Sequence, residues 1–354
     1  MPEFPVVDAA GSPYEVGRVH GAAVAGMVRA EVEARLGGQD RDVAFRYVAD
    51  VQAFVKDWAP HLLDEVRGIA DGAGIDQRAA LWLQWGTAAP DVRPEECTSF
   101  AVGPEFTGDG TVYAGQTKDT GPGANEQSIV LRVRPDGRPA ILSFSYAGNL
   151  AQIGISSTGV SLWGMSLFID SPGGGGGPLL KRMLLETDSV AAMRELAGAL
   201  ADGNGGAFAF SDADGSVGVL ERLPSRQVWL DGGRDSIGHA NIIASPEPAD
   251  RALDCYRTRC PSAGARHRRV NEALAERRGG FDVASGFAIL SDQRDHPKSI
   301  CRETMEVDGI LTNSAIVAEP LAGRLHVTYG PPTKAKPQTV SLTWPAAFVS
   351  DGSF

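Results

Sequence analysis

The spacing of apolar residues first changes near residue 97, and this change limits the possible folds more than any other feature. Before it, apolar side chains recur every three to four residues, most clearly in Arg41–Ala53 and His61–Gly74, which predicts helices. Pro60 precedes the second segment, where its missing N–H costs little, and glycines follow as at a helix C-cap. Ser12 has the position of an N-cap for a further helix. We therefore expect a mainly helical segment before residue 97.

After residue 97 the helical spacing gives way to short runs with strand propensity, divided by Gly, Pro, Asp and Asn. Asp136-Gly137 and Thr158-Gly159 have the composition of tight hairpin turns. The pattern predicts the meander of an antiparallel sheet. Its expected strands are Thr98–Val102, Val112–Gln116, Ser128–Val133, Ala140–Tyr146, Gln152–Ile155 and Gly159–Leu167.

A glycine-rich joint, Ser171–Pro178, leads from this meander into a second mixed region. Helices are expected at Leu179–Leu185 and Ser189–Leu200, and a basic helical stretch at about 249–278. The remaining strands are expected at Ala207–Ser211, Ser216–Glu221, Gln227–Leu230, Ser236–Ile243, Ile310–Ala318, Arg324–Tyr329 and Gln338–Trp344. With 43 glycines to supply turns, this order predicts an α+β fold, a four-layer αββα sandwich of two antiparallel sheets.

Charge and composition narrow the class of partner. The chain has 33 Lys and Arg against 44 Asp and Glu, a net charge of −11, so neither nucleic acid nor an anionic membrane is an expected partner. No run of 18 apolar residues occurs and the N-terminus has no signal-peptide pattern, so we expect a cytoplasmic protein that acts on a small molecule. Four scattered cysteines without CxxC spacing predict neither a disulfide scaffold nor a metal site, and no cofactor is expected. The oligomeric state stays open.

Cys97 lies where the spacing changes, and two hydroxyl residues and a strand follow it. By residue type alone, a buried free thiol is the more common role. A cysteine placed before a strand can also be a nucleophile. If the Glu96–Cys97 bond were broken, Cys97 would carry an α-amine with an unperturbed pKa of about 7.7–8.0, which is a general base for its own thiol. None of the six histidines stands out as the partner that an ordinary Cys–His hydrolase needs, but that class stays open.

Seven motifs, spread over nearly the whole chain, resemble the acyl-coenzyme A:isopenicillin N (6-aminopenicillanic acid) acyltransferase-like cysteine peptidase family. This family is a branch of the N-terminal nucleophile (Ntn) hydrolases. The motifs occur in the family's order and are Gly11–Gly21, Glu65–Gly74, Glu96–Phe100, Gly115–Asp119, Gly238–Asn241, Pro297–Arg302 and Leu325–Pro332.

The resemblance implies an αββα fold that is made as an inactive precursor. The precursor would cut itself between Glu96 and Cys97, and the fragments 1–96 and 97–354 would stay associated within one structural domain. Acyl groups would then be cleaved or transferred at amide bonds through a thioester on Cys97.

The resemblance also implies roles for single residues. Cys97 matches the nucleophile, and Asn241 matches an oxyanion donor, a contact worth about 3–4 kcal/mol, although a strand-end asparagine can instead bond its own turn. Asp119 matches an aspartate that would hold the α-ammonium of Cys97 or orient substrate, with a turn residue as the alternative. Ser99 shares the strand face of Cys97 and would assist self-cleavage or cap a backbone group. Candidate substrate contacts are Tyr146, Met165, His239, Arg302 and Ser314.

Some of these candidates have other common roles, and the chain departs from the family at some positions. A buried ion pair is the more common role for Arg302, and a structural hydrogen bond for His239. Met165 stands where an asparagine is common, Thr117-Lys118 replaces an Asn-aromatic pair, and Glu96 stands where small residues also occur. These departures argue against assuming the penicillin substrate.

Our leading interpretation is a self-processed amidohydrolase that cleaves a small N-acyl or aminoacyl amide through a Cys97 thioester. Nothing in the sequence resembles a phosphate cradle for coenzyme A, which favours hydrolysis. One alternative is an acyltransferase that passes the acyl group to an amine in secondary metabolism. Another is an unprocessed relative that binds a ligand and catalyses nothing.

Overall fold

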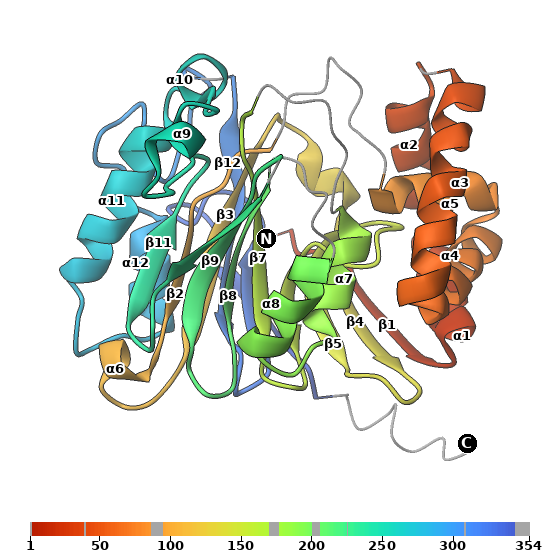
Figure 1. The fold of residues 1–354 in the computed structure, drawn as a ribbon, viewed down its shortest axis with the longest axis horizontal. Coiled ribbons are helices and arrows are strands. Elements are labelled where there is room, and N and C mark those ends of the chain that lie inside the picture. The colour runs from red at the N-terminus through yellow and green to blue at the C-terminus, as the bar shows by residue number, and fades with distance from the viewer. Residues whose placement is uncertain are drawn as a thin grey trace.

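Two β-sheets lie face to face, and helices cover the outer face of each (Figure 1). The computed structural model describes residues 2–38, 40–85, 95–169, 177–199, 206–224, 226–307 and 309–343. Helices α1 to α5 and α7, toward the right of Figure 1, lie over the larger sheet, and α11 and α12, at its left, pack on the smaller sheet. The predicted αββα sandwich is confirmed.

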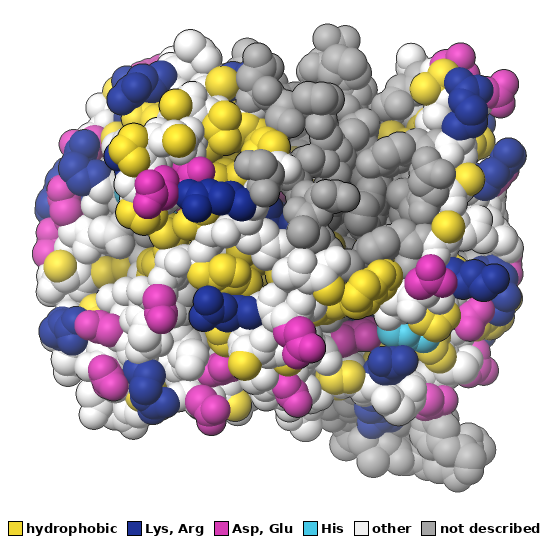
Figure 2. All heavy atoms as spheres, in the orientation of Figure 1, with side chains coloured by type: hydrophobic (Ala, Val, Ile, Leu, Met, Phe, Trp, Pro, Cys, Tyr) yellow, Lys and Arg dark blue, Asp and Glu magenta, His cyan; other side chains and the backbone are white. Residues whose placement is uncertain are grey.

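The described surface carries charges of both signs. On the face shown in Figure 2, Lys and Arg side chains are interspersed with Asp and Glu. Within the described ranges, no helix combines the length and the apolar character that a membrane span requires.

The larger sheet has eight strands in the order β1-β4-β5-β6-β7-β8-β9-β10. From β4 to β10 each strand pairs antiparallel with the next, which confirms the meander over this part. The predicted turns contain Gly137 at φ +67° and Gly159 at φ +89°, where a side chain would be strained. The strands are β1 (Val6–Gly11), β4 (Ser128–Pro135), β5 (Ile141–Tyr146), β6 (Ile153–Ser156), β7 (Ser161–Ser166), β8 (Gly206–Ser211), β9 (Val217–Arg222) and β10 (Gln227–Asp231).

The smaller sheet has six strands in the order β11-β2-β3-β12-β13-β14. It contains β2 and β3, which the sequence analysis wrongly joined to the meander of the other sheet. The local pattern could not show this, because β3 pairs with β12 from the far end of the chain. The strands are β2 (Ser99–Val102), β3 (Tyr113–Thr120), β11 (Ser236–His239), β12 (Leu311–Glu319), β13 (Arg324–Thr328) and β14 (Pro337–Ser341).

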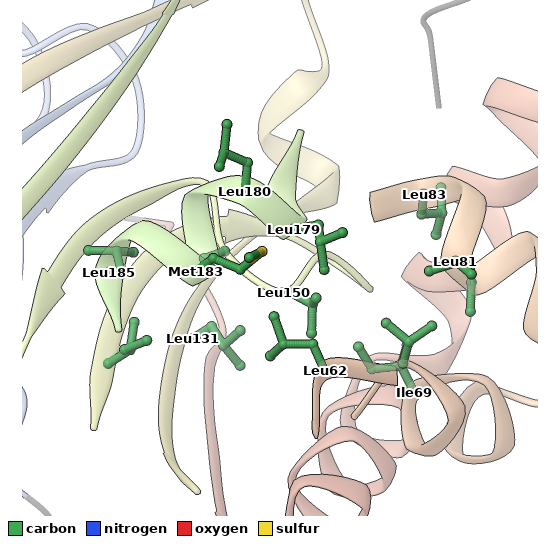
Figure 3. Close-up of a cluster of buried hydrophobic side chains, with 14 of the residues drawn as sticks. Leu62, Ile69, Leu81, Leu83, Leu131, Leu150, Leu179, Leu180, Met183 and Leu185 are labelled. Carbon is green, nitrogen blue, oxygen red and sulfur yellow. The ribbon is translucent and has the colours of Figure 1, made fainter. Parts of the chain in front are cut away.

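The helices over the larger sheet form a continuous apolar core with it (Figure 3). Leu62 and Ile69 of α4 belong to the same buried core as Leu150 and as Leu179 of α7. Burying each such side chain stabilises the fold by about 1.5–3 kcal/mol, so this core joins the first 96 residues to the rest. The helices are α1 (Pro13–Ala23), α2 (Ala25–Leu36), α3 (Arg41–Trp58), α4 (Pro60–Ala73), α5 (Gln77–Trp85), η1 (Ala124–Gln127), α7 (Pro178–Leu185) and α8 (Val190–Ala199).

The predicted helix ends at Ser12, Pro60 and Gly74 are confirmed, whereas α3 continues to Trp58, past its predicted end at Ala53. The Ser12 side chain accepts from the backbone N–H of Glu15, and the Glu15 side chain accepts from that of Ser12, which is a capping box. Pro60 is the first residue of α4, and Gly74 follows that helix at φ +67°.

The sequence analysis missed β1, the one described strand of the first segment. Val6–Gly11 pairs in parallel with β4, and Arg132 of β4 forms an ion pair with Asp8 at 2.7 Å. Its sequence, VVDAAG, is rich in residues that strands usually avoid, so the strand depends on its tertiary partner. In the described part of the first segment, β1 is therefore the one strand among helices.

On the smaller sheet, the predicted basic helical stretch is three helices. Pro261 divides it, because a residue before proline avoids helical backbone angles, and Cys260 accordingly has φ −148° and ψ +66°. The helices here are α6 (Pro104–Thr107), α9 (Pro248–Arg251), α10 (Tyr256–Arg259), α11 (Ala263–Ala275) and α12 (Val283–Leu290). Residues 171–176 of the predicted joint, and Trp344 at the end of the last predicted strand, lie outside the described residues.

Candidate active site

Cys97 lies just before β2, an inner strand of the smaller sheet between β11 and β3. The registers of β2 with β11 and with β3, continued by two residues, place Asn241 on one side of it and Lys118 on the other. Strand β12 places Ser314 opposite Lys118. Asn241, Cys97, Lys118 and Ser314 thus form one row across the sheet, which we call the Cys97 row.

The side chains around Cys97 on this row point toward the larger sheet. Cys97 belongs to the buried core between the two sheets. Ser99, two residues on, donates from Oγ to Sδ of Met165 at 3.0 Å, and its neighbour Gln116 donates from Nε2 to the carbonyl of Gly164 at 2.8 Å. Alternate strand residues share a face, so the thiol lies on this side as well. The structure therefore brings Ser99 and Met165 to the thiol side of the sheet.

Asn241 contacts the nitrogen of Cys97 directly. The Cys97 N–H donates to Oδ1 of Asn241 at 2.9 Å, and Arg266 donates to the same oxygen at 3.0 Å. The Nδ2 of Asn241 donates to the carbonyl of Ser166 at 2.8 Å. These partners fix which end of the amide is oxygen. Ser166 takes one of the two Nδ2 hydrogens, and the second can serve another acceptor.

Asp119 supports Glu96, the residue before Cys97, through its backbone. Its N–H and carbonyl exchange hydrogen bonds of 2.9 and 2.8 Å with Glu96. Its carboxylate accepts from Thr117 at 3.0 Å and Thr312 at 2.7 Å, and pairs with Arg302 at 3.2 Å. Since Asp119 is next to Lys118 in the strand, its carboxylate lies on the opposite face from the thiol.

Glu96 is fixed on that same opposite face by two buried arginines. Arg302 lies 2.7 Å from its carboxylate and Arg266 lies 3.1 Å from it, and Ser262 donates to it at 3.3 Å. Arg266 also donates to the carbonyl oxygen of Cys97 at 2.6 Å. The peptide groups on both sides of the Glu96–Cys97 bond are therefore held by charged or backbone partners.

The sequence analysis did not find Arg266. Its only signal was a place in the basic stretch after residue 249, which it shares with exposed arginines such as Arg268. Helix α11 turns Arg266 inward, where its side chain is fully buried. Arg302 was considered mainly as a buried ion-pair partner, and that is the contact it makes with Glu96 and Asp119.

A second charged group lies on the thiol side. Glu95 accepts from Nζ of Lys118 and from the hydroxyl of Tyr146, and Nζ of Lys118 lies 5.5 Å from the centre of the Tyr146 ring. Burial disfavours both charged forms, but the pairing with Lys118 holds the pKa of Glu95 at about 2. The same pairing outweighs burial at Lys118 and raises its pKa well above the usual range. Tyr146, a predicted substrate contact, thus lies beside Lys118.

The thiol itself is protonated at neutral pH in this uncleaved chain. Burial raises the pKa of Cys97 to about 11, although the Lys118 ammonium acts in the opposite direction. Lys181, on α7, donates a hydrogen bond from Nζ to Oε1 of Gln152 and lies against Gly164. Burial, together with repulsion from Lys118, lowers the pKa of Lys181 to about 8. The site therefore contains one firmly charged lysine and one that titrates near neutral pH.

The remaining two predicted residues have different surroundings. The Nε2 of His239 is 2.9 Å from Oε1 of Glu221, and its ring packs edge-on against His267 at 5.4 Å. Ser314 is fully buried, and its Oγ has no hydrogen-bond partner among the described residues. In the described ranges, no group of three or more His, Cys, Asp or Glu side chains is arranged to hold a metal ion.

The chain is 28% identical over 323 residues to the 40 kDa form of acyl-coenzyme A:6-aminopenicillanic-acid-acyltransferase from Emericella nidulans. The alignment covers 84% of each of the two chains. This match confirms the family resemblance seen in the sequence. No family model matches the chain.

Two solved structures are similar to the chain. Penicillin V acylase from Agrobacterium tumefaciens aligns with a TM-score of 0.45 and 14% identity, over 69% of this chain and 84% of that one. A mutant of the conjugated bile acid hydrolase from Clostridium perfringens aligns with a TM-score of 0.44 and 13% identity, over 69% and 92%.

Proposed function

We propose that the chain is a self-processed cysteine amidohydrolase whose nucleophile is Cys97. The observation that carries this proposal is the environment of the Cys97 nitrogen. It lies at the start of a strand, is buried, and donates to Asn241 at 2.9 Å. After cleavage this nitrogen is an α-amine, held in place beside its own thiol. The match to the acyltransferase over 84% of the chain supports a reaction on an acyl group.

Self-cleavage would begin with attack of Sγ of Cys97 on the carbonyl carbon of Glu96. The C–N bond between them breaks, and the thiol proton passes to the released nitrogen. Water then hydrolyses the thioester, which restores the thiol and leaves a carboxylate on Glu96. The ion pairs of Glu96 with Arg266 and Arg302 hold the acyl half of the bond during these steps.

Turnover would use the new α-amine as a general base. The amine takes the thiol proton, and the thiolate attacks the carbonyl carbon of the substrate amide. The second Nδ2 hydrogen of Asn241 can donate to the oxyanion, a contact worth about 3–4 kcal/mol. The proton then passes to the leaving amine as the C–N bond breaks. Water hydrolyses the Cys97 thioester and releases the acid.

Acyl transfer is the second candidate, and the printed name of the Emericella nidulans relative favours it. In this reaction an amine rather than water attacks the Cys97 thioester. The two reactions can be separated by incubating the enzyme with acyl amides and acyl thioesters, with and without an acceptor amine. Only acyl transfer gives a new amide.

The two fragments are expected to remain associated after cleavage. The first fragment supplies β1 to the larger sheet, paired along its length with β4. Glu65 of α4 also pairs with Arg182 of α7 at 3.0 Å, and both side chains are fully buried. These contacts cross the proposed cut and do not depend on the Glu96–Cys97 bond.

Denaturing electrophoresis and intact mass test the proposal. Wild-type protein should give fragments of about 10 and 27 kDa, by their share of the 37.3 kDa chain, and the larger should begin with Cys97. Cys97→Ala should remain one chain without activity, and Cys97→Ser, a matched control, should cleave slowly or not at all. A persistent single chain in the wild type, with acyl-amide turnover unchanged in Cys97→Ala, would contradict the proposal. Intact mass after incubation with acyl amides should show the acyl group on the larger fragment.

A further inference from the structure

We propose that the Lys118 end of the Cys97 row is a carboxylate-binding subsite for the acyl half of the substrate, and that Glu95 fills it until the chain is cleaved. This inference rests on the proposed function. It adds that the substrate carries a negative charge on its acyl half.

The first support is the position of Lys118. It is the strand neighbour of Cys97 on the same face, and its side chain is only 4% exposed. Residues directly opposite in an antiparallel pair have Cβ atoms about 4.5–5.5 Å apart. A carboxylate bound to this ammonium is therefore within one side-chain length of the carbonyl that Cys97 attacks. A buried ammonium also requires an anionic partner, because burial without one is unfavourable.

The second support is that two buried polar atoms near Lys118 have no hydrogen-bond partner among the described residues. Ser314 lies directly opposite Lys118, and its buried Oγ has no hydrogen-bond partner in the part of the chain that the structure describes. The Oε1 of Gln116, two residues before Lys118 and on the same face, also has none. Buried polar groups are normally hydrogen-bonded, so these two point to a ligand. The hydroxyl can donate to a carboxylate, and the amide oxygen can accept from an N–H of the substrate.

The third support is that a carboxylate already occupies the position. Glu95 accepts from both Lys118 and Tyr146. It precedes the proposed scissile bond, so it belongs to the acyl half of the group that Cys97 first attacks. Its side chain is 33% exposed, whereas that of Glu96 is 1% exposed and clamped by arginines. Rotation of the Glu95 side chain would therefore vacate the subsite without disturbing Glu96.

These contacts define a substrate class. An amide of a dicarboxylic acid, such as a glutaryl amide, has one carbonyl for Cys97 and a carboxylate on the same acyl half for Lys118. An N-acyl amino acid has its carboxylate on the amine half instead. The position of Glu95 on the acyl side favours the first class, and the second is a competing outcome of the test.

One experiment measures the subsite without catalysis. Glu95→Ala in a Cys97→Ala background removes a group the size of acetate and leaves Lys118 without Glu95. Acetate should raise the melting temperature of this uncleaved protein in a saturable way, and acetamide, its neutral counterpart, should not. Adding Lys118→Met should abolish the acetate effect. Equal responses to acetate and acetamide, or an acetate response that survives Lys118→Met, would overturn the proposal.

A second experiment uses cleaved wild-type enzyme and matched substrates. Glutaryl p-nitroanilide is compared with its neutral 4-carbamoylbutanoyl counterpart, and N-butanoylglycine with N-butanoylglycinamide. We expect kcat/KM to favour the charged member about tenfold or more in the first pair and less than threefold in the second, as a charge-assisted hydrogen bond to the acyl half would give. A preference confined to the second pair would overturn the acyl-half assignment.

The two experiments separate the inference from the proposed function. Turnover that depends on Cys97 but shows no charge preference in either pair leaves the function standing and overturns the subsite. A wild-type chain that never cleaves contradicts the function, and the acetate measurement then decides the subsite by itself.

Discussion

The charged side chains on the two faces of the smaller sheet around Cys97 are paired in different ways. On the face toward α11, Glu96 and Asp119 are matched by Arg302 and Arg266, and all four side chains are 1% exposed or less. This arrangement is closed: each carboxylate has several hydrogen-bond donors and is shielded from water. Removing one member leaves a buried charge without its partner, which is strongly destabilising.

On the opposite face, toward the larger sheet, the hydrogen bonding among the described residues is incomplete. Lys118 is paired with Glu95, whose side chain reaches solvent, and the Oγ of Ser314 beside it has no partner among the described residues. The thiol of Cys97 lies on this face. The two faces therefore differ in what they can do: the closed face fixes the backbone around Cys97, and the open face has capacity for a ligand.

The largest expected effect concerns the thiol on the open face. Because burial raises the pKa of Cys97 to about 11, its thiolate fraction grows tenfold per pH unit below that value. We expect the rate of Glu96–Cys97 cleavage to rise about a thousandfold between pH 7 and pH 10. Intact mass over time at a series of pH values measures it. Amide turnover by the cleaved enzyme should instead level off near pH 8, where the α-amine has lost its proton. A flat cleavage profile would contradict attack by the thiolate.

On the closed face, Arg302→Met should lower the free energy of unfolding by about 3–5 kcal/mol, because Glu96 and Asp119 lose a buried partner. Chemical denaturation in a Cys97→Ala background measures this without interference from cleavage. The control is Arg268→Met, since Arg268 is exposed and its ion pairs should contribute less than about 1 kcal/mol. Equal losses in the two variants would remove the distinction between closed and exposed charges.

Lys181→Met should stabilise the protein, and the gain should depend on pH. The folded-state pKa of about 8 lies below the usual 10.5, so the folded state binds its proton less readily than the unfolded state. Ionised Lys181 therefore costs stability below pH 8, and this cost disappears as pH rises to 10.5. We expect a gain of about 1–3 kcal/mol at pH 7 that shrinks over this range. Denaturation curves at several pH values measure it, with the exposed Lys298→Met as control. A gain that does not change with pH would contradict the lowered pKa of Lys181.

The smallest effects are expected from Thr312 and Ser314 of β12, which face opposite sides of the sheet because the strand register shifts between them. Thr312 donates to Asp119 at 2.7 Å and accepts from the N–H of Arg302 at 3.0 Å, so Thr312→Val should cost about 1–3 kcal/mol. Ser314→Ala removes a hydroxyl without a described partner and should change stability by less than about 0.5 kcal/mol. Thermal denaturation of both variants provides the comparison. A large loss in Ser314→Ala would show that the open face is satisfied after all.

Local sequence patterns predicted the elements of this fold well and their partners poorly. The helix ends at Ser12 and Pro60 and the hairpins at Gly137 and Gly159 depend on residues that are adjacent in sequence, and all four were predicted. The strand Val6–Gly11 depends on β4, and the sheet that contains β2 and β3 depends on β12. Neither pairing leaves a signal in the local pattern.

Prediction of the candidate site from sequence had the same limit. The motifs predicted Cys97 and Asn241 as site residues, and the structure brings them within hydrogen-bond distance. They could not identify Arg266, which is one arginine among several until helix α11 turns it inward. The pairing of Lys118 with Glu95 was also missed, because it requires the register of β2 against β3. Contacts set by register and by helix rotation need the assembled sheet.

The edge strand β1 has a consequence for how this protein must be made. If the chain is cut before Cys97, the larger sheet consists of two polypeptides, since Val6–Gly11 lies on the smaller one. A large fragment produced alone would expose the edge of β4, which is a template for wrong strand pairing. Synthesis as one chain avoids this, because the linked strand reaches β4 at a high effective concentration. It also fixes the ratio of the two pieces at one to one, so that neither is left over.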